Sequence, residues 1–135
     1  MDLEILKIAS NTKNHKVLNN VTHFSKLKNP ICGDEMDISL RIIDKKIKDF
    51  GYQCKSCIYC QASVSLLSRK AKNKLIEKVK FFAQQANSCF DKSVNSFGKE
   101  WEEFDKIMSK NNISRKECLL LPINATLDAL SKKIL

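Results

Sequence analysis

Glycine, proline and tryptophan are scarce in this sequence, which has three, two and one of them among 135 residues. Because tight turns rely on glycine and proline, their scarcity favours long helices over a turn-rich chain. Neither G-x-G-x-x-G nor G-x-x-x-x-G-K-S/T occurs. We therefore expect no glycine-rich phosphate-binding loop.

Long apolar runs are missing as well. The start, MDLEILKIASNTK, has two acids beside a short apolar run, and the run from Leu119 to Leu121 is far too short to cross a bilayer. This pattern indicates neither a signal peptide nor a membrane span, so we expect a cytoplasmic protein without a membrane partner. In that compartment, six cysteines indicate metal or redox chemistry before they indicate disulfides.

Acidic residues are outnumbered by basic ones, 15 to 24, which leaves a net charge of +9. Such an excess is typical of chains that bind nucleic acid, anionic membranes or acidic partners. The lysines, however, are spread along the chain, and there is no helix-turn-helix pattern, RNP-like aromatic strand or run of five consecutive charges. We interpret the charge as a lysine-rich solvated surface biased toward an acidic protein partner, with nucleic acid an unlikely partner.

The length indicates a single domain over residues 1–135, large enough to bury one core. Residues 20–27 mix β-branched and aromatic side chains and predict a strand. Apolar residues alternate with period two over residues 36–42, and a third strand is predicted over residues 47–52 after a turn at Asp44-Lys45. Short connections between these strands predict an antiparallel meander.

The remaining segments have helical spacing of apolar residues. The predicted helices cover residues 3–13, the segment after Cys60, residues 75–86, residues 101–108 and residues 117–134. Ser88 to Gly98 is a polar break, and Pro122 is expected in the first turn of the last helix. Strands followed by helices predict an α+β two-layer domain: a small three-stranded antiparallel sheet with helices packed on one face.

Three cysteines recur at every third position in CKSCIYC, namely Cys54, Cys57 and Cys60. A ferredoxin run, C-x2-C-x2-C-x3-C-P, needs a fourth cysteine and a proline, but QASVSLL follows Cys60. A redox C-x-x-C fits Cys57 and Cys60 by spacing, at a strand-to-helix junction, although the usual βαβ surroundings are missing. A zinc finger with two cysteines and two histidines is excluded because His15 and His23 precede every cysteine. Each cysteine alone is also compatible with a small buried hydrophobe.

Two distant cysteines extend the possibilities. Cys32 lies in NPICGD with Asp34 two residues on, and Gly33 between them allows a sharp turn that faces both side chains toward one ion. Cys57 precedes a predicted helix and Cys118 lies near the start of another, where free backbone N–H groups help to hold a thiolate. Three thiolates and a carboxylate suit a tetrahedral zinc site or one edge of an iron–sulfur cluster.

These residues also resemble a known family. NPICGD is similar to the N-P-x-C-G-D motif of the iron–sulfur scaffold proteins that include IscU, SufU and the N-terminal domain of NifU. CIYCQASVSLL resembles the family's cysteine followed by A-S-x-S, with Cys57 in the cysteine's place. R-x-x-C-x-x-L near the C-terminus is matched by Arg115, Cys118 and Leu121. The three motifs occur in the family's order across nearly the whole chain.

Spacing indicates the branch. The interval from Cys57 to Cys118 is longer than in IscU-type proteins, which also have a histidine where this chain has Glu117 and an L-P-P-V-K segment that is absent here. The extra helical sequence around residues 72–112, together with Arg115, resembles the SufU type.

The resemblance implies a SufE/NifU-like domain whose metal ligands are Cys32, Asp34, Cys57 and Cys118. It implies Cys118 or Cys57 as the catalytic thiol that takes a persulfide from a SufS-like cysteine desulfurase, with apo-proteins as downstream cluster acceptors. The cofactor is then Zn²⁺ or a transient 2Fe–2S or 4Fe–4S cluster. Arg115 is either a surface residue paired with an acid or a site residue that holds Asp34 or a persulfide anion.

The resemblance has departures. The family's N-terminal H-Y-x-x-P-R-N-x-G pattern survives only faintly in NTKNHKVLNN, which lacks its proline and glycine. Cys60 stands where many members have serine, and Cys54 and Cys89 have no family role. Two functions follow as alternatives: a scaffold or carrier of iron–sulfur clusters, or a zinc-dependent sulfurtransferase that stimulates the desulfurase and holds no cluster. Neither is a conventional enzyme.

Overall fold

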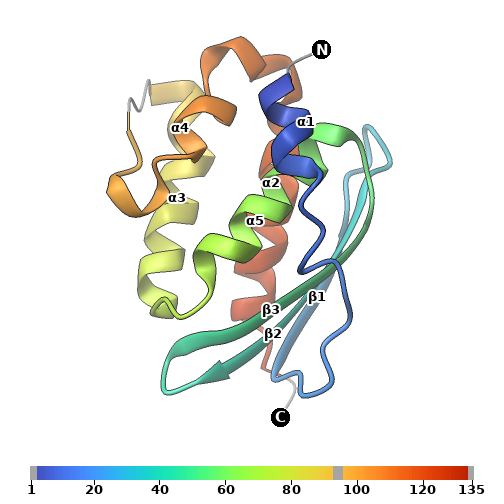
Figure 1. The fold of residues 1–135 in the computed structure, drawn as a ribbon, viewed down its shortest axis with the longest axis vertical. Coiled ribbons are helices and arrows are strands. Elements are labelled where there is room, and N and C mark those ends of the chain that lie inside the picture. Colours follow the sequence, from blue (N-terminus) through green and yellow to red (C-terminus); the bar gives the residue numbers. More distant parts are fainter. Residues whose placement is uncertain (1–2, 93–95, 134–135) are drawn as a thin grey trace.

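The computed structural model describes residues 3–92 and 96–133 (Figure 1). The elements, in chain order, are α1 (Leu3–Ala9), β1 (His23–Lys28), β2 (Glu35–Ile43), β3 (Lys46–Lys55), α2 (Ile58–Ala71), α3 (Ile76–Lys92), the 3₁₀ helix η1 (Lys99–Trp101), α4 (Phe104–Ile107), the 3₁₀ helix η2 (Lys110–Arg115) and α5 (Lys116–Leu130).

The three strands form the predicted antiparallel meander, in the order β1-β2-β3. Ile38 of β2 lies opposite Ser25 of β1 and Tyr52 of β3. Because side chains alternate across a strand, Met36, Ile38 and Leu40 share one face, and all three are fully buried there. The period-two pattern in the sequence therefore identified the core face of the central strand.

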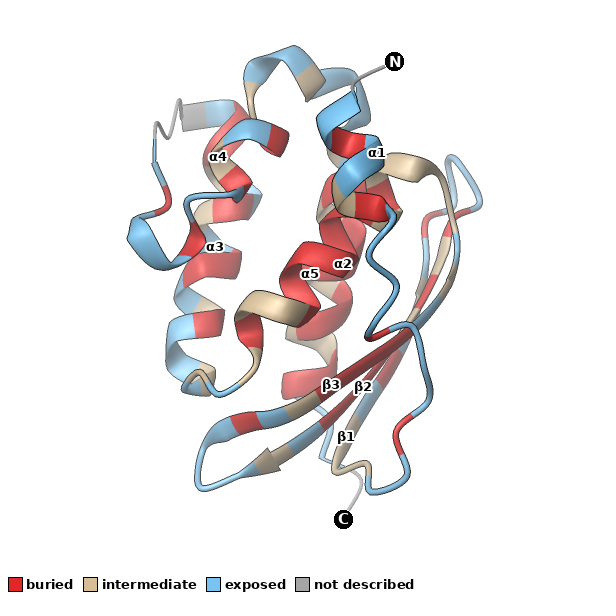
Figure 2. Ribbon diagram, viewed as in Figure 1, coloured by how far each residue is buried: buried red, intermediate tan, exposed pale blue. Residues whose placement is uncertain are grey.

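The helices cover that face of the sheet (Figure 1). α2 and α5 pack on the strands, α1 packs on α2, and α3 packs on α5. Figure 2 shows buried residues concentrated on α2, α5 and the strands on which these helices pack. The predicted α+β class, with helices on one face of a small sheet, is confirmed. None of the described helices is long and apolar enough to traverse a bilayer.

Helix boundaries differ from the prediction at several places. α1 ends at Ala9 instead of residue 13, and the predicted helix over residues 101–108 is divided between η1 and α4. α3 continues into the expected polar break because Cys89 and Phe90 extend its buried face. Residues 93–95 of that break, and Ile134 of the last predicted helix, lie outside the described residues.

Pro122 lies in the interior of α5, as its seventh residue, and not in the first turn. A proline there removes one helical hydrogen bond, at a cost of roughly 3 kcal/mol. The buried side chains on either side of it, Leu119, Leu121 and Ile123, pack into the core and hold the helix together through that position. Tertiary packing therefore overrides the local signal.

The chain before β1 runs along the free edge of β3. The backbone N–H of Tyr52 donates to the carbonyl of Asn14 at 3.1 Å, and the ring of Tyr52 stacks on His15. Next to it, a Cβ on Gly51 would lie 2.6 Å from the carbonyl oxygen of Lys16. Glycine is therefore required at position 51 for the close approach of this segment.

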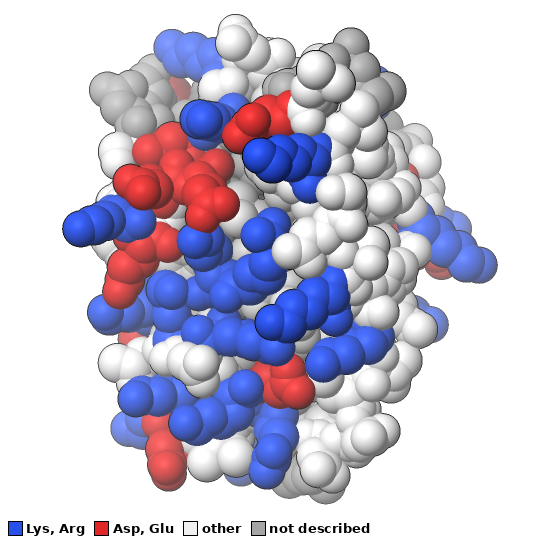
Figure 3. Space-filling model, viewed as in Figure 1, with Lys and Arg blue, Asp and Glu red and all other residues white. Residues whose placement is uncertain are grey.

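Folding gathers lysines that are separate in the sequence. The tip of the β2–β3 hairpin pairs with the α2–α3 loop, since Ile76 donates to the carbonyl of Lys45 and Lys46 forms a bridge with Leu75. Figure 3 shows a band of Lys and Arg side chains across this view of the molecule, with acidic residues clustered beside it. The basic charge is thus more concentrated on the surface than the spread of lysines along the chain indicates, which suits an acidic partner surface.

Candidate metal centre

The loop between β1 and β2 holds Cys32 and Asp34 in a closed turn. The N–H of Asn29 donates to the carbonyl of Asp34 at 2.8 Å, and the N–H of Gly33 donates to the carbonyl of Asn29 at 2.8 Å. The Asn29 side chain accepts from the N–H of Ile31 at 2.9 Å. Gly33 has a φ of +78°, which favours glycine, and the turn points Asp34 inward while Cys32 stays exposed.

The second segment is the N-terminus of α2, where Cys57 is the N-cap residue in extended conformation. Its side chain makes no capping hydrogen bond, so the thiol is free for other partners. Its backbone N–H donates to Oδ2 of Asp34 at 3.4 Å. The carboxylate therefore lies at the positive end of the α2 dipole, a favourable place for negative charge.

The third segment is the first turn of α5, where Cys118 is the third residue and is 6% exposed. One turn further into α2, the hydroxyl of Ser63 donates to the carbonyl of Leu119 at 2.7 Å. This buried bond fixes the first turns of α2 and α5 side by side. The starts of the two helices, which carry Cys57 and Cys118, therefore lie near each other.

The potential ligand atoms of Cys32, Asp34 and Cys118 all lie within 4.8 Å of one another. Ligand atoms about 2.3 Å from a zinc ion at tetrahedral angles are separated by roughly 3.8 Å, so this set is close to metal-binding size. Cys57 is not in that mutual set, but its backbone N–H donates to Asp34, and its negative charge contributes to the raised pKa of the Cys118 thiol. The structure thus brings three of the four expected ligands together and places the fourth beside them.

Electrostatics make the site attractive to a cation. The pKa of the Cys118 thiol is raised well above its ordinary value, first by burial, then by its hydrogen bond with Cys57 and by the negative charges of Cys57, Asp34 and Cys32. Negative groups crowded in a buried place oppose one another's ionisation. A bound metal ion reverses that effect and stabilises thiolates.

Arg115 lies beside the site. Its guanidinium is 5.3 Å from the ring centre of Tyr59, the second residue of α2, in a cation–π contact. Within the part of the chain that the structure describes, it is not in an ion pair. The structure therefore does not show the first interpretation of Arg115, pairing with an acid. Its contact with Tyr59 joins the start of α5 to the start of α2.

The other cysteines differ in access. Cys60, in the first turn of α2, is completely buried, and burial raises its pKa far above the ordinary value. Cys54, near the end of β3, is half-buried, and its pKa is also raised by burial. Cys89 lies in α3, where its thiol faces the Met108 carbonyl at 3.9 Å and burial raises its pKa to about 11. Cys89 is therefore a packing residue of the α3–α4 region.

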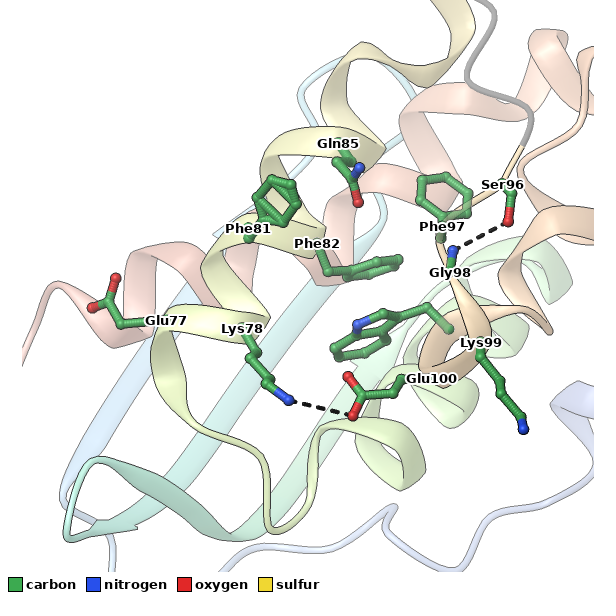
Figure 4. A pocket seen from close by; sticks show the side chains of 11 residues that line it. Glu77, Lys78, Phe81, Phe82, Gln85, Ser96, Phe97, Gly98, Lys99 and Glu100 are labelled. Atoms are coloured by element: carbon green, nitrogen blue, oxygen red, sulfur yellow. Dashed lines mark hydrogen bonds and ion pairs between the residues drawn. The ribbon is translucent and has the colours of Figure 1, made fainter.

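A hollow of about 530 Å³ lies between α3 and η1 (Figure 4). Phe82 stacks on Trp101 at its base, with ring centres 4.2 Å apart. Lys78 and Glu100 form an ion pair of 3.5 Å at its rim. No cysteine lines this hollow, so it is separate from the candidate metal centre.

Three residues that shape the site were not assigned a role from the sequence. Asn29 has a recognisable signal, because an asparagine before a proline often begins a turn through its side chain. Ser63 belongs to the A-S-x-S motif, but only the structure gives its role in joining α2 to α5. Nothing in the sequence indicates that Tyr59 would contact Arg115.

The fold agrees with that of the proteins to which the chain is similar. The iron–sulfur cluster assembly scaffold protein IscU of Thermotoga maritima is 28% identical over 134 residues, 95% of this chain and 90% of that protein. The crystal structure of a nitrogen-fixing NifU-like protein (N-terminal) from Brucella abortus superposes with a TM-score of 0.89 at 18% identity, covering 96% of this chain and 91% of that one.

A putative iron–sulfur cluster assembly scaffold protein for the SUF system from Fervidobacterium islandicum superposes with a TM-score of 0.80 at 24% identity, covering 96% of each chain. At such identities, likeness to solved structures shows the shared fold. The family model of the NifU-like N-terminal domain matches residues 2–100, which include Cys32, Asp34 and Cys57 and end before Cys118. This chain belongs to the family of NifU-like N-terminal domains.

Proposed function

We propose that this protein assembles or relays iron–sulfur clusters as a scaffold. Cys32, Asp34, Cys57 and Cys118 bind the metal, and a cluster of the 2Fe–2S or 4Fe–4S type is the cargo that is built there and passed on to apo-proteins. The observation that carries the proposal is the meeting of Cys32, Asp34 and Cys118 within 4.8 Å, from three segments far apart in the sequence. The likeness to the IscU scaffold of Thermotoga maritima supports the same function.

The chemistry of the donors supports a transient cargo. Thiolates are soft ligands that suit iron–sulfur clusters, and a carboxylate is a harder and weaker ligand for the same metal. Cys32 is exposed, and the neighbouring Ile31 has 85% of its surface exposed, so one side of the centre is open to a partner protein. Such an edge allows a cluster to be passed on without unfolding of the core.

The sulfur for the cluster comes, in this proposal, from a SufS-like cysteine desulfurase. The acceptor is Cys118 or Cys57, which lie at the starts of α5 and α2 on either side of Asp34. Arg115 lies over Tyr59 beside them and supplies the positive charge that holds a persulfide anion. The long segment between the two cysteines, which contains α3, η1, α4 and η2, favours the SufU type within the family.

A second candidate function is a zinc-dependent sulfur acceptor that stimulates the desulfurase and never holds a cluster. The specific observation in its favour is the donor set, because three thiolates and one carboxylate complete the four ligands of a closed zinc site. Zinc keeps the thiols deprotonated and protected from oxidation until a partner displaces one ligand.

Metal analysis of the full chain, purified without oxygen, separates the two functions. Iron, cysteine and a cysteine desulfurase are added, and the metal content and visible spectrum are measured before and after. A stable brown chromophore with bound iron and sulfide supports the scaffold. One tightly held zinc, with faster desulfurase turnover and no chromophore, supports the acceptor.

Variants test the ligand assignment. Cys32→Ser, Cys57→Ser and Cys118→Ser should each reduce metal retention at least tenfold, since each removes a ligand. Cys89→Ser is the matched control, because Cys89 is buried in α3 away from the site. A Cys118→Ser variant that keeps full metal binding and sulfur transfer would contradict the proposal.

A further inference from the structure

Cys60 is a thiol that the proposed ligand set does not use, although it lies next to one of its members. Cys57 is the N-cap residue of α2, and Cys60 is the third residue of the helix. In the capping box of other helices, the side chain at each of these two positions bonds to the backbone N–H of the other, so the two residues are neighbours. Residues three apart at a helix start have Cβ atoms about 5–6 Å apart, and a modest adjustment brings such a pair within disulfide distance.

The two thiols differ in their access to solvent, as expected for a thiol that accepts sulfur from outside and a thiol that resolves the persulfide. Cys57 is partly exposed, while Cys60 has 0% of its surface exposed. External electrophiles therefore reach Cys57 and not Cys60. Burial raises the pKa of the Cys60 thiol, and the negative charges of Asp34, Cys54 and Cys57 raise it further. Cys57 and Cys60 therefore share one electrostatic environment.

A buried hydroxyl accompanies Cys60. The Oγ of Ser56 is buried and has no hydrogen-bond partner among the described residues. It lies toward the thiols of Cys54 and Cys60, and it counters part of the rise that burial causes in both pKa values. A hydroxyl with an unused proton in this position can donate to a thiolate that forms on Cys60.

We propose that Cys60 is the resolving thiol of a sulfide-releasing reaction, and this inference rests on the proposed sulfur acceptance. A persulfide on Cys57 is attacked at its inner sulfur by Cys60. The Cys57–Cys60 disulfide forms, the bond between the two persulfide sulfurs breaks, and the outer sulfur leaves with the Cys60 proton as hydrogen sulfide. The Cys60 sulfur is oxidised and the outer sulfur is reduced, so this step consumes no external reductant.

Sulfur reaches Cys57 in either of two ways. It arrives there directly, or it arrives on Cys118 and moves when the Cys57 thiol attacks the outer sulfur of the Cys118 persulfide, which leaves Cys118 as a free thiol. Both cysteines lie around Asp34, which accepts from the Cys57 N–H and has its carboxylate within 4.8 Å of the Cys118 thiol, so a small movement allows this exchange. A dithiol reductant reopens the Cys57–Cys60 disulfide before another cycle.

The test uses the full chain, reduced, stripped of metal with a chelator and kept without oxygen. It is loaded with inorganic polysulfide and desalted, after which released sulfide and intact mass are followed over time. In the wild-type chain we expect the added sulfur atom to disappear as about one equivalent of sulfide is released. Trypsin gives a peptide of residues 56–69 that contains Cys57 and Cys60 but not Cys54, and it should be lighter by two hydrogens.

Cys60→Ser and Cys60→Ala should keep the persulfide and release sulfide at least tenfold more slowly, whereas Cys89→Ser should match the wild type. Equal release rates in folded Cys60 variants overturn the inference, and so does a disulfide that maps to Cys57 and Cys118 in the wild-type digest. The digest needs no variant, so it decides the question even where a Cys60 variant fails to fold. Absence of a persulfide in every chain overturns the sulfur acceptance itself, a result distinct from a persulfide that decays without Cys60.

Discussion

Replacing Asp34 should slow the release of metal from the centre. Asp34 is the one hard ligand of the proposed set, and it is 9% exposed between the thiols of Cys32 and Cys118. A carboxylate leaves a soft metal more easily than a thiolate does, so it opens the first position for an incoming acceptor. Removing it removes that exit route.

The geometry gives the size of the effect. Two unit charges 4.8 Å apart, the largest separation between ligand atoms here, repel by roughly 3.5 kcal/mol at an effective dielectric constant of about 20. Once Asp34 has detached from the metal, this repulsion from the Cys118 thiolate keeps it away. Because Cys32 is exposed, water reaches this place and weakens the repulsion. A realised effect of about 1.4 kcal/mol corresponds to tenfold slower release.

The assay compares Asp34→Ala and Asp34→Asn with the wild type after anaerobic reconstitution. A chelator in excess is added, and the decay of the cluster absorbance, or of bound zinc, gives the release rate. Asp34→Asn keeps the size of the side chain and an acceptor for the Cys57 N–H, so it isolates the charge. Asp37→Ala is the control, because that acid lies outside the candidate ligand set, on β2, where it forms an ion pair with Lys26.

Slower release by about tenfold in both Asp34 variants, with Asp37→Ala unchanged, agrees with the proposed exit route. Release at the wild-type rate or faster in folded Asp34 variants would refute the reasoning. That result would mean that the carboxylate retains the metal instead of helping it to leave.

Three further predictions concern the surroundings of the centre. Gly51→Ala should lower the free energy of unfolding by about 2 kcal/mol in denaturant titrations, because its Cβ would collide with the Lys16 carbonyl; an unchanged midpoint contradicts this. Arg115→Gln should slow sulfur transfer from the desulfurase several-fold while changing stability by less than about 1 kcal/mol, since an exposed contact with Tyr59 contributes little to folding. An equal transfer rate would assign Arg115 to the surface alone. Burial lowers the pKa of His23 below 6.5, so the unfolded chain binds more protons and stability should fall as the pH drops through and below 6.5. His23→Gln should weaken the dependence of the free energy of unfolding on pH, and an unchanged dependence is evidence against the His23 assignment.

The central strand and the cluster of motifs were predictable because each depends on local rules. The alternation from Met36 to Ile42 identifies a face of β2 without knowledge of its neighbours. NPICGD predicts a sharp turn at Gly33, and the structure has that turn, with a φ of +78° at Gly33. Local signals of this kind act within a few residues, so the sequence alone is sufficient.

What the sequence did not predict depends on contacts between distant segments. Pro122 remains inside α5 because buried neighbours hold the helix, a balance that no local pattern contains. The helix expected over residues 101–108 is divided, although Trp101 and Phe104 are both buried as its apolar spacing requires. Periodicity identified the buried side chains there and not the path of the backbone.

Placement of the proposed ligands shows the same division. Residue types and motifs predict Cys32, Asp34, Cys57 and Cys118 as a set, but not which of them lie close together. The bond from Ser63 to the α5 backbone sets the separation of the two helix N-termini, and it joins positions 56 residues apart. A spacing rule within one segment contains no such distance.

The position of Cys57 links the two proposals and sets an order for them. Cys57 is the N-cap residue of α2, next to Asp34 of the proposed ligand set, and Cys60 lies three residues further along the helix. A thiolate bound to metal is not available to carry a persulfide, and a sulfur in a disulfide is not available as a ligand. Sulfide release through Cys60 must therefore precede binding of metal by Cys57. Metal added before the sulfur donor should block formation of the disulfide within residues 56–69, and metal added after reduction of that disulfide should bind normally.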